Sequence, residues 1–205
     1  LRKLKEQGVN FKLHCSIGGW TWSGNFSKAI RTEERRRAFL SSIIDFLKKY
    51  KIFEGIDFDW EYLSTDGKNY GLEGNEADAS DGKNFVEFLK LTKNELIKNG
   101  MGHYTISMCV VAAPEKANFN ISEVHPLMDE IRVMTYDFHD GAWGEKKSAF
   151  HTNPRKSSFG VWSAEEAMDF YISKGVPPHK LLLGAAYYSR GYSNTDGPGK
   201  PADGG

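Results

Sequence analysis

The sequence predicts an α/β fold built on a mostly parallel sheet. Strand-like and helix-like segments alternate along the chain, and no internal repeat interrupts them. The length of 205 residues and the hydrophobic content of 40% fit one sizeable domain with its own core. The strand-like segments are 11–17, 55–62, 104–112, 131–136 and 181–187, and helix-like segments start near residues 31, 81 and 163.

The segment 31–50 carries the clearest helix signals. Thr32 can cap its start, while Glu33 and Glu34 place negative charge in the first turn, where the helix dipole favours it. Its apolar residues recur on one face, and they are Phe39, Leu40, Ile43, Ile44 and Leu47.

The other two helices are predicted from signals of the same kind. Asp81 is expected to cap the second helix. Its apolar residues are Phe85, Phe88, Leu89, Leu96 and Ile97. Ser163 and Glu166 form a capping-box pattern for the third, which Gly175 and Pro177 end.

The segments between these elements read as loops. A long polar loop is expected over 63–80, a loop with a short helical turn over 114–130, and an irregular loop over 137–162. Everything after Gly191 is turn-forming. Five strands do not close an eight-unit barrel, which usually needs ~250 residues. The alternation therefore leaves two architectures open, an open doubly wound sheet and a barrel with pieces missing.

Charge and cysteine content exclude some classes of function. The 27 Lys and Arg residues balance 27 Asp and Glu residues, which argues against a nucleic-acid partner and against a polybasic membrane contact. Cys15 and Cys109 are too few for a disulfide framework, and each lies in an apolar run that suggests a small buried hydrophobe. The six histidines show no paired ligand spacing and are interpreted as surface or core residues. No metal and no cofactor is expected.

The most informative segment is an acidic strand. With a period of two, Asp57, Asp59 and Glu61 lie on one face. The opposite face is apolar and consists of Ile56, Phe58, Trp60 and Tyr62. Carboxylates in a row repel one another, so at least one should keep its proton near neutral pH, as a general acid requires. A solvated acidic face and a carboxylate metal site are the alternatives, and the covered faces of a parallel sheet argue against the first.

This strand resembles the acidic motif of glycoside hydrolase family 18, the chitinases. The family motif reads Asp-Gly-x-Asp-x-Asp-x-Glu, and this chain has Glu54, Gly55, Asp57, Asp59 and Glu61 at the corresponding positions. Three further stretches resemble family motifs in the family's order: 16–20, 134–137 and 187–191. The resemblance covers the chain from residue 11 to about residue 192.

The resemblance implies a (β/α)8 TIM barrel of which the chain covers roughly strands 3 to 7. Residues 1–192 would be a partial catalytic domain, and residues 193–205 the turn-rich start of an inserted α+β subdomain. With strands missing, the chain expressed alone is expected to aggregate or be inactive. Glu54 departs from the family's aspartate, and the expected consequence is a small shift in the proton network rather than loss of catalysis.

Roles for individual residues also follow from the resemblance. The implied catalytic residues are Glu61, Asp59, Asp57 and Tyr136, with Glu61 as the acid. The implied substrate-binding residues are Met134, Asp137, Trp143, Arg190, Trp20 and Trp22. The supporting residues are Ser16, Gly18, Gly19, Glu54 and Gly55. For the two tryptophans after the third-strand motif, loop packing is an equally good explanation, and Trp60 is expected in the core because of its parity.

The implied function is a chitinase that hydrolyses β-1,4 links between N-acetylglucosamine units. The family retains the anomeric configuration and uses the acetamido group of the substrate as nucleophile. The expected partners are chitin or N-acetylglucosamine oligomers, with no nucleic acid and no membrane, and the expected location is secreted or extracellular, although no signal peptide is visible. A non-hydrolytic lectin and an endo-β-N-acetylglucosaminidase on the same fold are the alternatives, and association with flanking or partner chains stays open.

Overall fold

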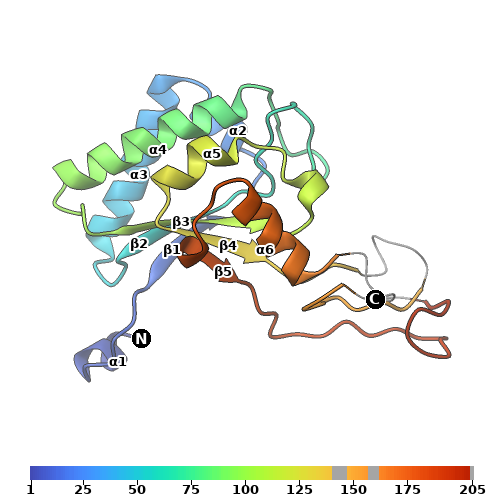
Figure 1. The fold of residues 1–205 in the computed structure, drawn as a ribbon. Coiled ribbons are helices and arrows are strands. Elements are labelled where there is room, and N and C mark those ends of the chain that lie inside the picture. The colour runs from blue at the N-terminus through green and yellow to red at the C-terminus, as the bar shows by residue number, and fades with distance from the viewer. Residues whose placement is uncertain (140–146, 157–161, 204–205) are drawn as a thin grey trace. The chain divides into compact units, whose positions relative to one another are not determined.

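The computed structural model describes residues 1–139, 147–156 and 162–203. Its strands are β1 (His14–Gly18), β2 (Gly55–Asp59), β3 (Thr105–Val111), β4 (Glu130–Met134) and β5 (Leu181–Leu183). Its α-helices are α1 (Arg2–Glu6), α2 (Phe26–Ile30), α3 (Glu33–Lys49), α4 (Asp81–Lys98), α5 (Ile121–Val124) and α6 (Ala164–Ser173) (Figure 1). Short 3₁₀ turns cover Pro114–Lys116, His125–Leu127 and Pro178–Lys180.

The five strands form one sheet in the order β1-β2-β3-β4-β5. β1 with β2 and β2 with β3 pair in parallel, which confirms the α/β class. The strands follow one another in chain order with no point at which the order reverses. A barrel wall has this order, whereas a doubly wound sheet reverses it at a switch point.

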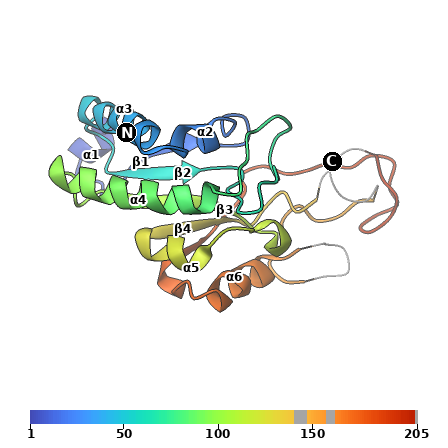
Figure 2. The ribbon, with the colours of Figure 1, turned by 90° about the horizontal axis from the view of Figure 1, so that it is seen from above.

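The chain forms two compact units. The first comprises Leu1–Cys109 and Asn118–Ile131, and the second comprises Val110–Ala117 and Arg132–Gly205. In the first unit, α3 and α4 lie on the same side of β1 and β2 (Figure 1), and in the view from above the two strands show between the two helices (Figure 2). In the second, Gly184 donates its N–H to the Val133 carbonyl at 2.9 Å, which joins β5 to β4.

Aromatic rings fill the space between β2 and its helices. Phe58 is fully buried and meets Phe85 and Phe88 of α4 edge-on, with centroids 5.8 and 5.5 Å apart. Trp60 is 3% exposed and stacks on Phe26 of α2 at 5.1 Å. The predicted split of this strand into an apolar face and an acidic face is therefore confirmed, as is the core position of Trp60.

The helix signals are confirmed with one correction. Thr32 caps α3 by accepting a hydrogen bond from the Arg35 N–H at 3.3 Å, and Ser163 caps α6 by accepting one from the Glu166 N–H at 3.2 Å. The prediction that Asp81 caps α4 is wrong, because Asp81 is the first residue of that helix. It is almost fully buried, and its carboxylate accepts from the Ser27 hydroxyl and the Asp78 N–H, each at 2.8 Å.

Both cysteines also differ from the prediction. Cys15 and Cys109 are free and partly exposed rather than buried hydrophobes. The two lie on opposite faces of the sheet, since Cys15 pairs with Ile56 on the apolar face whereas Cys109 bonds to Asp57 on the acidic face. Across the described residues, no helix combines the length and apolar character needed to cross a membrane.

Candidate active site

Asp57 is the best-satisfied member of the acidic row. The parallel register sets it between Ser16 of β1 and Ser107 of β3. Ser107 Oγ donates to its Oδ1 at 2.7 Å and Ser16 Oγ donates to its Oδ2 at 3.0 Å. The Cys109 thiol donates to the same Oδ2 at 3.4 Å, and Asp57 is only 3% exposed. Three donors from the two neighbouring strands therefore hold this carboxylate in place.

Asp59, two residues further along β2, has a different environment. Its Oδ1 is buried and has no hydrogen-bond partner among the residues that the structure describes. Burial, and to a lesser extent the negative charge of Asp57, raise the pKa of Asp59 to about 6. This agrees with the expectation that one acid in the row keeps its proton to a higher pH than an ordinary aspartate does. The free oxygen is suited to accept an N–H from a ligand.

Glu61 lies just beyond the end of β2, which stops at Asp59. It is 8% exposed, and the peptide bond that joins it to Tyr62 is cis. The backbone groups of Glu61 bind the side chains of Ser23 and Asn75 rather than a neighbouring strand. The carboxyl ends of parallel strands are where barrel enzymes keep their chemistry, so Glu61 is at the expected place for a catalytic acid.

The loop after β1 fits closely against this end of β2. Gly18 and Gly19 both have positive φ angles, 108° and 90°, and Gly19 donates its N–H to the Asp59 carbonyl at 2.6 Å. A side chain at Gly18 would collide with that same carbonyl oxygen and with the Phe26 ring. A residue with a side chain would therefore be strained at both positions and would also collide at position 18.

The two tryptophans of this loop present exposed rings. Trp20 is 44% exposed and makes an edge contact with Tyr62 at 6.4 Å, and Trp22 is 80% exposed. An exposed indole next to a row of acids offers an apolar face to a sugar ring. Neither ring is used to fill the core, so loop packing explains Trp22 poorly.

Glu54 and Gly55 are found at the opposite end of β2. Glu54 precedes the strand and forms an ion pair with Lys5 of α1, which lowers the pKa of its carboxyl. A Cβ atom at Gly55 would come within 2.6 Å of the His14 ring and 2.7 Å of the Thr105 carbonyl oxygen. The glycine therefore lets β2 pack between its neighbours, and the glutamate secures the strand's start rather than extending the acidic row.

The second compact unit brings Asp137 and Arg190 together. Arg190 donates from Nε and Nη2 to Asp137 Oδ1 at 3.0 and 2.8 Å, and the Tyr188 hydroxyl donates to Oδ2. Asp137 itself has a positive φ of 54°, and His151 Nδ1 lies 3.7 Å from its Oδ1. Burial and the bonded carboxylate raise the pKa of Tyr188, which keeps its proton on the hydroxyl.

Two other predicted residues belong to this unit. Met134 ends β4, and Tyr136 follows it and meets the Tyr188 ring edge-on at 6.3 Å. The residue between them, Thr135, donates to the Gly184 carbonyl at 2.6 Å and so joins this turn to the chain after β5. Trp143 lies outside the described residues.

Sequence reasoning missed several residues that contact the predicted ones. Ser107 shares the face of β3 with Cys109, so a period of two along 105–111 could have singled it out once the register to Asp57 was known. Ser23 and Asn75 come from loops, where no periodicity points to them. Among the described residues, no cluster of three or more His, Cys, Asp or Glu side chains is arranged to hold a metal ion.

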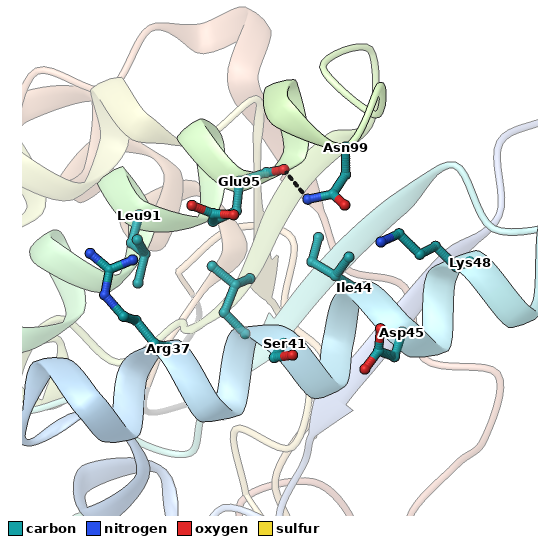
Figure 3. Close-up of a pocket in the computed structure, with 9 residues that line it drawn as sticks. Arg37, Ser41, Ile44, Asp45, Lys48, Leu91, Glu95 and Asn99 are labelled. Atoms are coloured by element: carbon teal, nitrogen blue, oxygen red, sulfur yellow. Dashed lines mark hydrogen bonds between the residues drawn. The ribbon is translucent and has the colours of Figure 1, made fainter.

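One cavity of the first unit lies away from the acids, between α3 and α4 (Figure 3). It measures about 210 Å³ and is lined by Arg37, Leu40, Ser41, Ile44, Asp45, Lys48, Leu91, Glu95 and Asn99. Its lining includes salt-bridging surface residues, and the buried Asp59 oxygen lies elsewhere. We therefore place the candidate active site at the acidic row and not in this cavity.

Known proteins resemble this chain over nearly its whole length. Chitinase 1 of Aphanocladium album is 33% identical over 98% of this chain, and chitinase A1 of Niallia circulans is 35% identical over 94% of it. These matches span 46% and 28% of the two relatives, so the chain spans less than half of their length. Chitinase ChiA74 from Bacillus thuringiensis superposes with a TM-score of 0.87 at 30% identity, covering 98% of this chain and 33% of that one.

A second solved structure is informative about ligands. The second catalytic domain of the Ostrinia furnacalis group II chitinase, in mutant form, was solved in complex with the N-acetylglucosamine oligomer (NAG)5. It superposes with a TM-score of 0.80 at 27% identity, covering 98% of this chain and 52% of that one. The family model of the glycosyl hydrolases family 18 matches residues 1–204, and the chain belongs to this family.

Proposed function

We propose that this chain supplies the acidic catalytic row of a chitinase that cleaves β-1,4 links between N-acetylglucosamine units. The observation that carries the proposal is the environment of Asp59. Its buried Oδ1 lacks a partner among the described residues, whereas the neighbouring Asp57 accepts three hydrogen bonds. A buried polar atom without a partner costs ~1–3 kcal/mol, and an acetamido N–H of the substrate would satisfy it.

The proposed chemistry is the one that the resemblance to family 18 implies, with these acids in its roles. Glu61 gives its proton to the glycosidic oxygen as the bond to C1 breaks, and the acetamido oxygen of the same sugar attacks C1. Asp59 accepts the acetamido N–H and stabilises the positive charge of the resulting ring. The Glu61 carboxylate then takes a proton from a water molecule, which opens the ring at C1 and leaves the product in its original anomeric configuration.

The remaining residues have roles that rest on the resemblance. Tyr136 would donate to the acetamido oxygen, and Met134, Asp137, Trp143 and Arg190 would line the subsite of the cleaved sugar. Trp20 and Trp22 would stack on neighbouring sugars. Chitin oligosaccharides are the proposed substrate, and the (NAG)5 complex of the Ostrinia furnacalis relative supports that class. We also propose that the protein acts outside the cell, because chitin is a polymer too large to reach an enzyme inside one.

The test is turnover of chitin oligomers by the full-length protein and its Glu61→Gln variant. We expect turnover to fall at least ~100-fold, because a general acid contributes that much or more, while oligomer binding persists. Glu87→Gln on α4 makes the same change at an exposed position and should leave turnover unchanged. Near wild-type turnover by Glu61→Gln would contradict the assignment. A wild-type protein that binds oligomers without cleaving them would indicate a lectin, and a preference for N-glycan cores would indicate an endoglycosidase.

A further inference from the structure

The backbone of Glu61 is held by two side chains from different loops. The strand ladder ends at Asp59, so the N–H and C=O groups of Glu61 lie beyond it. The Glu61 N–H donates to Ser23 Oγ at 2.9 Å, and Asn75 Nδ2 donates to the Glu61 carbonyl at 3.1 Å. Both polar groups of this residue's main chain therefore bind side chains.

Ser23 is built into its place. Its side chain is fully buried, and its hydroxyl proton faces the carbonyls of Gly19, at 2.8 Å, and Asp59, at 3.2 Å. A hydroxyl has one proton to donate and lone pairs with which to accept, so its bonding capacity is used on the backbone around Glu61. At this depth, bulk solvent does not reach the position of the hydroxyl.

Asn75 comes from the long loop between β2 and α4. The Glu76 N–H next to it donates to the Gly24 carbonyl at 3.2 Å, which ties this loop to the one that carries Ser23. Gly71 of the same loop passes so close to the Glu61 carbonyl that any side chain there would collide with it. The two loops thus enclose the Glu61 backbone from both sides.

We propose that Ser23 and Asn75 are positioning residues that fix where Glu61 presents its carboxyl to the substrate. This inference rests on the proposed function, in which Glu61 is the acid. Glu61 is the one acid of the row beyond the ladder, so the sheet alone does not set its position. We call Ser23 and Asn75 the Glu61 clamp. A displacement of ~1 Å in a catalytic group can cost ~100-fold in rate, so loss of either clamp residue should slow the reaction.

The test compares Ser23→Ala and Asn75→Ala in the full-length protein with two matched controls. Ser27→Ala removes an equally buried serine hydroxyl that donates to Asp81 instead. Asn99→Ala removes an amide that donates to the Glu95 carbonyl at 2.8 Å, at the far end of α4 (Figure 3). The readouts are kcat and KM for chitin oligomers per folded molecule, and the pH dependence of kcat.

We expect kcat of both clamp variants to fall ~10- to 100-fold with KM little changed, because the position of the acid affects the transition state more than binding. The pH profile of kcat should shift as well, because a displaced carboxyl is surrounded by different groups. Ser23→Thr, which keeps the hydroxyl, should recover most of the rate. The control variants should keep the wild-type kcat even if they unfold more easily. Wild-type kcat and pH profile in both clamp variants would overturn the proposal.

Crystal structures of the two clamp variants separate this inference from the proposed function. If the protein proves not to be a chitinase, the proposed function fails, yet the clamp still predicts a displaced Glu61 backbone and carboxyl in each variant. An unmoved Glu61 in both variants would overturn the clamp whatever the activity. Asn75 lies in a partly exposed loop, so its variant is expected to fold even if Ser23→Ala does not.

Discussion

Two aspartates that are two residues apart on one strand meet opposite environments. Asp57 accepts three hydrogen bonds from the flanking strands, whereas Asp59 has a buried oxygen that accepts none from the described residues. Alternation along the strand predicts that both face the same side. The difference between them comes from which side chains the neighbouring strands present opposite each acid, and therefore from the register.

Asp59 should make the folded protein less stable as the pH rises. Its folded pKa of about 6 lies above the unfolded value of 3.8, so between these values the folded state binds more protons than the unfolded state. Stability from this group is present below the unfolded pKa and is lost as the pH rises through the folded pKa. Asp59→Asn cannot ionise, so it should exceed the wild-type free energy of unfolding by about 1–2 kcal/mol near pH 8, after allowance for solvent screening, and lose that advantage near pH 4.

Urea unfolding at the two pH values checks this prediction. Asp57→Asn is the control, and it should be destabilised, because its amide NH₂ would face groups that already donate to this position. An Asp59→Asn protein whose stability relative to wild type is the same at both pH values would contradict the pKa of Asp59.

At the scale of elements, Gly18 joins β1 to the acidic end of β2. Gly18→Ala should destabilise the protein by more than the ~1–3 kcal/mol of backbone strain, because the new methyl group also collides with the Asp59 carbonyl and the Phe26 ring. Gly100→Ala is the control, since Gly100 also has a positive φ, 73°, but open space around it. Equal free energies of unfolding for the two variants would show that the close approach of the loop is not needed.

The cap of α3 offers a second test at this scale. Thr32→Ala removes the acceptor of the Arg35 N–H and should cost ~1 kcal/mol in the free energy of unfolding, with no change in the denaturant m-value. Thr32→Asp keeps an acceptor and adds a favourable charge at the helix start, so it should retain the stability. If the alanine variant unfolds at the wild-type midpoint, the cap contributes nothing.

The elements could be predicted where local chemistry decides them. Caps and a 3.6-residue period were enough for α3, α4 and α6, although Ser80 rather than Asp81 is the residue before α4. The helices α1 and α2 have five residues each, too few for a period to show. β2 was predicted to reach Tyr62 and ends at Asp59, because the chain there leaves the ladder and binds loop side chains instead.

At the scale of the whole molecule, the strand order distinguishes a barrel wall from a doubly wound sheet, which the alternation of strands and helices alone could not do. Strands that pair in chain order are expected of a barrel wall. The acidic row and its motif were visible in the sequence. The partners Ser107, Ser23 and Asn75 were not, since they depend on register and on loop conformations that no local pattern encodes.

The proposed mechanism predicts which polymers the full-length protein can cleave. The acetamido oxygen is the nucleophile, so removing the N-acetyl group removes the attacking atom and also the N–H that Asp59 would bind. Fully deacetylated chitosan and cellulose should therefore be cut at least ~100-fold more slowly than N-acetylated oligomers. Reducing-end assays on matched oligomers measure this, and comparable rates on deacetylated chains would exclude the substrate as nucleophile. A stable thiazoline mimic of the cyclised sugar should compete with the substrate.

The most direct test of the proposed mechanism is the anomer that the full-length protein first releases from a chitin oligomer, followed by proton NMR before mutarotation. Attack by the acetamido group followed by water inverts C1 twice, so we expect initial release of the β-anomer, with the α-anomer appearing later. Asp59 would hold the acetamido group in the geometry that this path needs. Initial release of the α-anomer would mean that water attacks directly, and it would contradict the proposed roles of Asp59 and Glu61.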